Sequence, residues 1–346
     1  MSNSTNILDV SQLEQYVNEN AGLRQAVGAA ADDVLRLEPF AQGEYNVNYK
    51  LVCAGSQEQA RYLFRVNLGS QMHLDHQIEY EMNALRLLAP SGRVPQAVYV
   101  DGSKAQLPYG VGVETLLPGR PLDYSCDLAE AAAILADIHA VAVPSECGLV
   151  APGHPVAAIV DECEQMFNVY RTWDGADASL VARIDALFKV ADGIAQSDRR
   201  RSAPENLHVV NTEVNSSNFL INPGRRGYLV DWEKPVLGEV EQDLAHFLVP
   251  TTTFWKTDTQ FTRADVEGFV DQYVRAVDRR FATDSLSDRL DDYLVVTCLR
   301  GLTWSAMALS EYVGGGRAAA NADTFAKIQE YVQDPFLSLV EREYYS

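Results

Sequence analysis

Two stretches decide the fold of this chain: Asn-Thr-Glu-Val-Asn-Ser-Ser-Asn at Asn211–Asn218 and Tyr-Leu-Val-Asp-Trp-Glu at Tyr228–Glu233. The first places a carboxylate, Glu213, five residues before an amide, Asn218. The second opens with an apolar run that predicts a short strand ending at Asp231. Because loops that follow strands commonly carry functional groups, we expect these three polar side chains to belong to one site.

The order of these groups is typical of a centre that transfers phosphoryl groups. An apolar run, Leu207–Val210, precedes the first stretch, so Glu213 is expected just beyond a strand end, where it would orient an attacking hydroxyl. Asn218 and Asp231 offer the oxygen ligands that Mg²⁺ prefers. For each residue taken alone, an ordinary polar side chain at a turn is the favoured interpretation. The complete order of acid, amide, strand and second acid favours the site.

Short runs rich in β-branched and aromatic residues fill the first third of the chain. Residues 34–115 predict a small sheet that carries one helix, and residues 1–31 predict a helical extension before it. The expected elements are strands at Tyr49–Cys53, Tyr62–Val66, Val94–Asp101 and Tyr109–Glu114 and a helix at about Leu74–Leu88.

The rest of the chain is predicted to be mainly helical. Asp127–Glu130 reads Asp-Leu-Ala-Glu, a capping-box pattern that predicts a helix to about Ala140. Long amphipathic stretches extend from about Val156 to Ala195 and from Arg263 to the C-terminus. Residues 204–233 interrupt them with two short strands. The fold class is therefore α+β.

The length of the chain and the change from strand-rich to helix-rich sequence patterns predict two lobes. Residues 1–115 would form a small antiparallel-sheet lobe that binds nucleotide. Residues 116–346 would form a larger helical lobe that holds the catalytic loop, 207–233, and the acceptor site.

Charge and cysteine content limit the partners. The formal net charge is −20 at pH 7, which disfavours nucleic acid and anionic membranes because both require clustered Lys and Arg. The five cysteines are dispersed and form no CxxC pair, which predicts reduced thiols and no zinc site. The N-terminal stretch has no signal-peptide pattern, and no apolar run approaches the roughly 18 residues of a membrane helix. A cytoplasmic location is expected.

The two quoted stretches resemble the aminoglycoside phosphotransferase and choline kinase superfamily, whose fold is like that of protein kinases. In that family the catalytic loop usually reads His-Gly-Asp, four residues and Asn, and the second acid lies in Asp-Trp-Glu or Asp-Phe-Glu. Here Asn211–Glu213 stands in place of His-Gly-Asp, Asn218 matches the Asn, and Asp231–Glu233 matches fully. Gln242–Ala245 resembles the family's Asp-Leu-Ala stretch, and Ala136–His139 is like its helix string ending in His. His139 is expected to pack rather than catalyse.

This resemblance covers roughly residues 34–310 and implies a two-lobed, protein-kinase-like fold with ATP (or GTP) and Mg²⁺ as cofactors. It implies that Glu213, Asn218 and Asp231 are catalytic and that Asn218 and Asp231 bind the metal.

The resemblance also assigns nucleotide-binding residues. Gln42–Tyr49 is similar to the phosphate-covering turn, in which backbone N–H groups near Gly43 and Asn46 would face phosphate oxygens, although a plain β-turn reads the same way. Arg65 occupies the strand position that usually donates a Lys, and choline kinases often use Arg there. Its ion-pair partner would be Glu81, with Glu79 as second choice.

The segment that joins the lobes, Val113–Gly119, would contact adenine through backbone groups, with Glu114 and Leu116 in this segment.

The acceptor pocket is expected to use residues of the helical lobe. Aromatic rings with acids can enclose a quaternary ammonium, but core Trp and surface Glu residues read the same way. The substrate candidates are Glu233, Thr253, Trp255 and Trp304, with Trp173, Thr251, Thr252 and Glu311 as further contributors.

The departure at Asn211–Glu213 leaves more than one function open. Glu213 keeps the carboxylate on a side chain one methylene longer, so it can still accept or orient a hydroxyl proton. The first interpretation is a phosphotransferase that moves the γ-phosphoryl group to a hydroxyl of an aminoglycoside-, choline- or sugar-like metabolite. The second is a pseudokinase-like protein that binds nucleotide or a metabolite with little or no transfer. The third is nucleotidyl transfer. Neither the acceptor nor the oligomeric state follows from the sequence.

Overall fold

The computed structural model describes residues 8–43, 45–54, 60–144, 146–204, 206–315 and 322–345. The chain divides into two compact units. Unit 1 contains Met1–Arg120, Val143–Leu149 and Leu220–Pro235, and unit 2 contains Pro121–Ala142, Val150–Phe219 and Val236–Ser346. Unit 1 therefore includes Asp231 and Glu233, although they lie far along the sequence. Glu44, inside the predicted phosphate-covering turn, falls outside the described residues.

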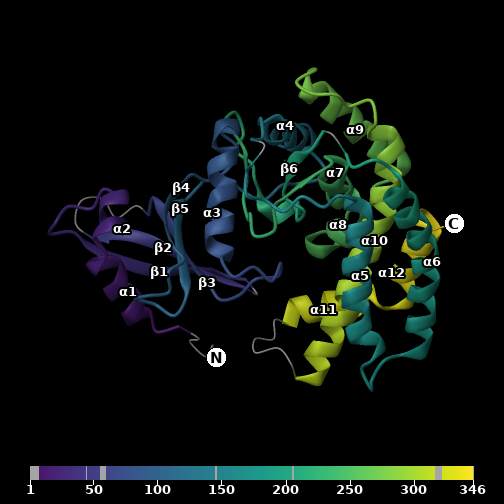
Figure 1. Ribbon diagram of the computed structural model, residues 1–346, viewed down its shortest axis with the longest axis horizontal. Coiled ribbons are helices and arrows are strands. Elements are labelled where there is room, and N and C mark those ends of the chain that lie inside the picture. Colours follow the sequence, from purple (N-terminus) through teal and green to yellow (C-terminus); the bar gives the residue numbers. More distant parts are fainter. Residues whose placement is uncertain are drawn as a thin grey trace. The chain divides into compact units, whose positions relative to one another are not determined.

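Unit 1 is built around a five-stranded antiparallel sheet of order β1-β2-β3-β5-β4 (Figure 1). The strands are β1 (Val34–Gln42), β2 (Asn46–Ala54), β3 (Tyr62–Asn67), β4 (Ala97–Asp101) and β5 (Gly110–Thr115). The strands predicted at Tyr49–Cys53 and Tyr62–Val66 are confirmed as β2 and β3, which pair antiparallel, and both are longer than expected. The sequence did not delimit β1, because only Leu35 and Leu37 alternate as buried residues before this edge strand becomes exposed.

Helices cover both faces of this sheet. α1 (Val10–Glu19) and α2 (Ala21–Ala26) pack Leu13, Tyr16, Val17 and Leu23 into a core that includes Phe64, Val66, Val111 and Val113 of the sheet. α3 (Gln77–Leu88) lies on the other side (Figure 1). Gly112 of β5 permits this approach, because a Cβ there would lie 2.7 Å from Met82 Cε. Side chains alternate along a strand, so Arg65, between Phe64 and Val66, points away from the α1–α2 core.

Unit 2 is mainly helical, which confirms the α+β class. The 29-residue helix α10 packs against α5, α6, α7 and α11. The helices are α4 (Leu128–His139), α5 (Pro155–Arg171), α6 (Ala178–Arg200), α7 (Glu241–Leu248), α8 (Pro250–Lys256), α9 (Arg263–Val277), α10 (Leu286–Gly314), α11 (Ala322–Tyr331) and α12 (Asp334–Tyr344). β6 (His208–Val210) pairs antiparallel with β9 (Val236–Gly238). Two further short strands are β7 (Phe219–Leu220) and β8 (Tyr228–Leu229), and two 3-10 turns are η1 (Ala89–Ser91) and η2 (Ser216–Asn218).

The predicted capping box at Asp127 is wrong, although the helix it announced is present. Asp127 has φ −107° and ψ 7°, and its side chain makes no capping hydrogen bond. Its Oδ2 accepts instead from the backbone N–H of Asp123 at 2.8 Å. A capping residue normally adopts an extended backbone that turns its side chain toward the N2 and N3 amides, and Asp127 does not.

The amphipathic stretch expected at about residues 156–195 forms two helices. α5 ends at Arg171, and α6 begins after Asp177, whose Oδ1 accepts from the N–H groups of Ser179 at 2.7 Å and Leu180 at 3.0 Å. A side chain that caps a new N-terminus satisfies backbone donors that would otherwise lack partners, so a break here is stable.

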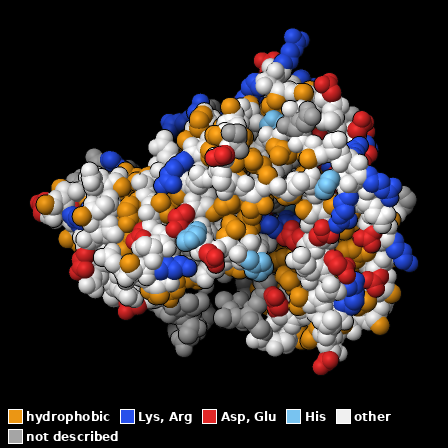
Figure 2. Space-filling view, in the orientation of Figure 1, with side chains coloured by type: hydrophobic (Ala, Val, Ile, Leu, Met, Phe, Trp, Pro, Cys, Tyr) orange, Lys and Arg blue, Asp and Glu red, His pale blue; other side chains and the backbone are white. Residues whose placement is uncertain are grey.

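On the face shown in Figure 2, acidic and basic side chains are interspersed, and the basic side chains do not form one continuous patch. Among the described residues, no helix combines the length and apolar composition that crossing a membrane requires.

Glu241, at the start of α7, gives a prediction about stability. It is 3% exposed, and burial, together with the nearby Glu239, raises its pKa to about 7. The pKa of Glu241 in the folded protein exceeds the ordinary value of 4.5, so the folded state binds the proton more tightly than the unfolded chain does. This contribution to the free energy of unfolding is fully present below pH 4.5 and is lost as the pH rises toward 7. We expect Glu241→Gln to gain stability relative to the natural chain between pH 5 and pH 8, by about 3 kcal/mol at most.

Thermal melts across this pH range measure the effect. Glu267→Gln on α9, where the side chain is 66% exposed, is the control. Its melting temperature should differ from that of the natural chain by the same amount at every pH. If the difference in melting temperature between Glu241→Gln and the natural chain does not change with pH, the raised pKa of Glu241 is contradicted.

Candidate active site

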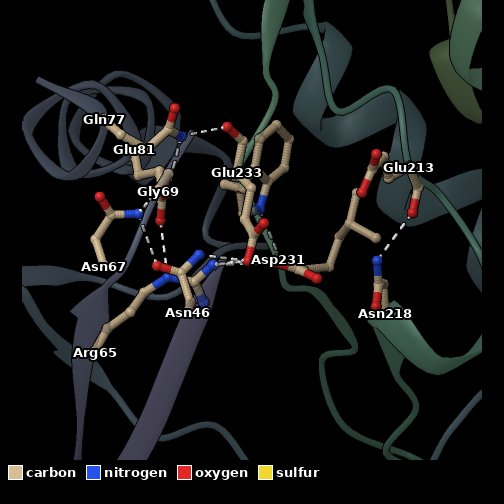
Figure 3. Close-up of polar contacts among 12 residues, drawn as sticks. Asn46, Arg65, Asn67, Gly69, Gln77, Glu81, Glu213, Asn218, Asp231 and Glu233 are labelled. Atoms are coloured by element: carbon tan, nitrogen blue, oxygen red, sulfur yellow. Dashed lines mark hydrogen bonds and ion pairs between the residues drawn. The ribbon is translucent and has the colours of Figure 1, made fainter. Parts of the chain in front are cut away.

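Arg65 gathers three carboxylates in unit 1 (Figure 3). Its Nε lies 2.8 Å from Oε2 of Glu81 on α3. Its Nη2 lies 3.2 Å from Oδ1 of Asp231 and 2.5 Å from Oε1 of Glu233. Arg65 is 5% exposed and Glu81 is 2% exposed, so this ion pair is shielded from solvent. Residues from β3, from α3 and from the stretch after β8 therefore meet at one guanidinium.

Glu79, the alternative partner, lies elsewhere. Its Oε1 is 3.5 Å from Nδ1 of His76, and its carboxylate fills the space beside Gly102, where a Cβ would lie 1.8 Å from Oε1. Residues two apart on a helix point about 200° away from each other, so only one of Glu79 and Glu81 can face Arg65.

Glu233 connects Arg65 to the predicted phosphate-covering turn. Asn46, which is 1% exposed, donates from Nδ2 to Oε1 of Glu233 at 2.5 Å. Asn67 in turn donates to Oδ1 of Asn46 at 3.0 Å. Gln77 donates from Nε2 to the backbone carbonyl of Glu233 at 2.6 Å and to Oε1 of Glu81 at 2.9 Å. This network holds both the backbone and the side chain of Glu233.

Negative charge exceeds positive charge around Arg65. Burial alone would lower the pKa of Arg65, but Glu81, Glu233 and Asp231 outweigh it and raise that pKa, so the guanidinium stays charged. Burial raises the pKa of Glu81 and that of Glu114, the latter to about 7. Burial and the Asp231 carboxylate raise the pKa of Glu233. One cation among four carboxylates favours the uptake of a proton or of a further cation.

Asp231 is held in an unusual backbone conformation. Its φ is +65°, in the left-handed region that Asp tolerates better than most residues. Before it, the N–H of Leu229 donates to the carbonyl of Arg93 at 2.8 Å. After it, the buried ring of Trp232 donates from Nε1 to the carbonyl of Leu229 at 3.1 Å. These bonds anchor the backbone on both sides of Asp231.

In unit 2, Asp243 on α7 fixes the start of the predicted catalytic loop. Its Oδ2 accepts from the N–H of Asn211 at 2.8 Å, and its Oδ1 accepts from the N–H of Thr212 at 2.7 Å. Nε2 of His139 lies 3.2 Å from Oδ2 of Asp243, and Nδ1 of His139 lies 2.7 Å from the hydroxyl of Tyr273. His139 is fully buried, which agrees with a packing role.

Asn218 is tied to the backbone of Glu213. Its Nδ2 donates to the carbonyl of Glu213 at 2.9 Å (Figure 3), and the N–H of Glu213 donates to Oδ1 of Asn211 at 3.0 Å. Because the amide nitrogen of Asn218 is used in this bond, Oδ1 is the atom that can bind a cation.

Arg300 on α10 is a contact of this loop that the sequence did not reveal. Its Nη2 lies 3.5 Å from Oε1 of Glu213, and its Nη1 donates to the carbonyl of Thr212 at 3.4 Å. No local motif marks Arg300, because it meets the loop only through the packing of unit 2.

The other nucleotide-binding candidates all lie in unit 1. The N–H of Gly43 donates to the carbonyl of Asn46 at 2.9 Å. Glu114 is 9% exposed and lies in the electrostatic environment of Arg65. The N–H of Leu116 donates to the carbonyl of Arg61 at 2.9 Å, which leaves its carbonyl oxygen as the backbone group that a base could contact.

The acceptor candidates separate into two groups. Glu233 belongs to the Arg65 cluster of unit 1. In unit 2, Thr253 is 1% exposed and its hydroxyl donates to the carbonyl of Thr259 at 2.6 Å. The rings of Trp255 and Trp304 meet edge to face with centroids 5.5 Å apart. Trp255 also lines a cavity of about 430 Å³ with Lys256, Thr257, Asp258, Asp323, Thr324, Ala326, Lys327 and Glu330.

The predicted metal ligands, Asn218 and Asp231, belong to different units. Each stands on its own well-anchored backbone and offers oxygen, which suits Mg²⁺. In the described part of the chain, no three His, Cys, Asp or Glu side chains form a ready metal centre. An oxygen donor of this kind suits an ion that takes its remaining ligands from phosphate and water.

Comparison with known proteins places this geometry in a family. The model of the phosphotransferase enzyme family, APH, matches residues 36–288, well over half of the chain. No curated protein sequence matches. Among solved structures, a candidate aminoglycoside phosphotransferase from Ralstonia eutropha JMP134 is 18% identical, with a TM-score of 0.66 over 97% of this chain and 98% of that one.

Two further structures have similar folds. Choline kinase from Cryptosporidium parvum Iowa II is 13% identical, with a TM-score of 0.63 over 96% of this chain and 99% of that one. A spectinomycin phosphotransferase, solved with ADP and spectinomycin, is 12% identical, with a TM-score of 0.59 over 96% and 98%. The chain has the kinase-like fold of these proteins, and it belongs to the phosphotransferase enzyme family.

Proposed function

We propose that this protein transfers the γ-phosphoryl group of ATP (or GTP) to a hydroxyl of a small metabolite, with Mg²⁺ as cofactor. The observation that carries the proposal is the Arg65 cluster, in which one buried guanidinium binds Glu81 and the acid Asp231. The ADP in the spectinomycin phosphotransferase supports a nucleotide cosubstrate. That enzyme and the choline kinase support an aminoglycoside-, choline- or sugar-like acceptor.

Each residue has a role that its surroundings permit. Arg65 would bind phosphate oxygens, because a guanidinium presents two parallel N–H donors to them. Glu213 would orient the acceptor hydroxyl and accept its proton. Oδ1 of Asn218 and the carboxylate of Asp231 would hold Mg²⁺, which neutralises negative charge on the phosphates when bound. Catalysis then rests on positioning and charge, with little covalent chemistry by the protein.

Glu233 has to change partners when nucleotide binds. In the structure its carboxylate contacts Nη2 of Arg65, which this proposal assigns to phosphate, and Nδ2 of Asn46 in the predicted phosphate-covering turn. Phosphate oxygens would replace the carboxylate at Nη2 of Arg65. Glu233 therefore competes with phosphate for as long as no cation neutralises the cluster.

Removal of this competitor gives a prediction. We expect Glu233→Gln to bind ADP in excess EDTA about 10-fold more tightly than the natural chain, because the neutral side chain is a weaker partner for Arg65. Isothermal titration calorimetry measures the affinity. Glu114→Gln removes another buried carboxylate of the same cluster and serves as control, with an expected gain below about threefold. An equal gain in both variants would show that net charge alone matters, and no gain with Glu233→Gln would contradict the competition.

A second candidate function is nucleotide binding with little or no transfer. It is favoured by Glu213 in place of Asp and by Thr212, a β-branched residue at φ +69°. Two assays separate the candidates: thermal shift with ATP and Mg²⁺, and ADP release over a panel of aminoglycosides, choline, ethanolamine and sugar alcohols. Turnover with a phosphorylated product supports the kinase, whereas a thermal shift without turnover on any acceptor supports the pseudokinase. A product that gains a nucleotidyl mass would identify nucleotidyl transfer.

A further inference from the structure

Arg300 bridges three groups of unit 2. Its side chain is 14% exposed. Nη2 lies 3.5 Å from Oε1 of Glu213, Nη1 donates to the carbonyl of Thr212 at 3.4 Å, and Nε lies 3.4 Å from Oε2 of Glu162 on α5. The guanidinium thus stands between a helix carboxylate and the loop that carries the proposed catalytic acid.

The geometry fixes the direction in which this guanidinium points. Glu162 pairs with one edge of the planar fork, so the two terminal nitrogens are directed at the loop. Burial alone would lower the pKa of Arg300, but Glu162 and Glu213 raise it, so the side chain remains a cation. α5 and α10 pack closely along their lengths, which makes this a rigid support.

The loop needs such support at Thr212. A φ of +69° is strained for a β-branched residue, and in the resembling family the corresponding position is Gly. Asp243 binds the N–H of Thr212 at 2.7 Å, and Arg300 binds its carbonyl. The peptide groups on both sides of the strained residue are therefore held, as a strained conformation requires if it is to persist.

We infer that Arg300 is a positioning residue that holds the longer Glu213 side chain in its working orientation, in a chain where Glu replaces the usual Asp. The inference rests on the proposed function of Glu213. An additional methylene adds a rotatable bond and moves the carboxylate by more than 1 Å, and a misplacement of that size costs about 100-fold in rate. An ion pair to a fixed guanidinium removes this freedom.

A double-mutant cycle tests the inference. The activity is Mg²⁺-dependent ADP release from ATP, with the first acceptor of the panel that supports turnover, or with water as acceptor. Arg300→Met is expected to lower kcat about 10- to 100-fold and to change KM for ATP by less than about twofold. Arg300→Lys should recover part of the loss. In a Glu213→Gln background, Arg300→Met should change kcat by less than about twofold, because its effect runs through the carboxylate.

A control variant and three outcomes separate the role of Arg300 from that of Glu213. Arg280→Met removes a different ion pair of unit 2, the one with Asp137 at 2.7 Å, and should leave kcat unchanged. Multiplicative losses in the double variant, or an unchanged kcat in Arg300→Met, would overturn the role of Arg300 alone. An unchanged kcat in Glu213→Gln would overturn the proposed function instead.

Crystal structures of Arg300→Met and Arg300→Lys give a readout that needs no turnover. We expect the Glu213 carboxylate to move in Arg300→Met while the bonds between Asp243 and the loop remain, and to return in Arg300→Lys. A Glu213 side chain that keeps its place in Arg300→Met would overturn the inference.

Discussion

Asp231→Asn is expected to lower Mg²⁺-dependent ADP release about 1,000-fold. Asp231 follows β8, its backbone is anchored on both sides, and its Oδ1 lies 3.2 Å from Nη2 of Arg65. Asn has almost the same shape, so the change removes charge while it preserves packing. Loss of one preorganised charge at a phosphoryl-transfer centre costs on the order of 100- to 1,000-fold, and loss of a metal ligand lies at the upper end.

The measurement is ADP release with the acceptor found in the panel, at saturating ATP and over a range of Mg²⁺ concentrations. Asp75→Asn, an exposed acid of the same unit, is the matched control and should keep full activity. Thermal melting should show that both variants are folded. Turnover of Asp231→Asn within about 10-fold of the natural chain would contradict the assignment of Asp231 as a metal ligand.

Glu213→Gln is expected to lower kcat by about 100- to 1,000-fold with little change in KM for ATP. The amide keeps the size of the side chain but cannot accept the hydroxyl proton, and general-base contributions are typically 100- to 10,000-fold. Glu213→Asp keeps the carboxylate but withdraws it from Arg300, so its loss should be about 10- to 100-fold. With respect to residue 213, kcat should therefore be highest with Glu, lower with Asp and lowest with Gln.

Single-turnover kinetics of the three proteins would measure this order directly. A Glu213→Gln protein as active as the natural chain would show that Glu213 is not the residue that accepts the proton. A Glu213→Asp protein more active than the natural chain would show that the loop is not adapted to Glu.

The elements that bear the Arg65 cluster were largely predictable, because their signals are local. Alternating β-branched and aromatic residues marked β2, β3 and β5, and helical spacing marked α3. Helical periodicity alone did not show which of Glu81 and Glu79 pairs with Arg65. The answer depends on how α3 is rotated about its axis where it packs on Gly112 and the rest of the sheet. The motif that contains Asp231, Tyr228–Glu233, was recognisable because its residues are consecutive.

Contacts that depend on long-range packing were not predictable. Arg300 lies 87 residues beyond Glu213 and has no neighbouring motif, so only the packing of α10 reveals it. The contact between Glu233 and Asn46 was missed for the same reason, because the two residues are 187 positions apart. The capping box at Asp127 failed because the sequence pattern does not determine the backbone angles that bring the side chain to the helix. The left-handed conformation of Thr212 runs against the preference of its residue type.

We propose above that the side chains of Asn218 and Asp231 each supply an oxygen ligand to a divalent cation when nucleotide is bound. A crystal structure of the protein with ADP and Mn²⁺, with anomalous data collected at the manganese edge, tests it most directly. We expect a manganese peak within about 2.3 Å of Oδ1 of Asn218 and of a carboxylate oxygen of Asp231. A nucleotide-bound structure in which either residue lies outside the coordination sphere of the metal would contradict it.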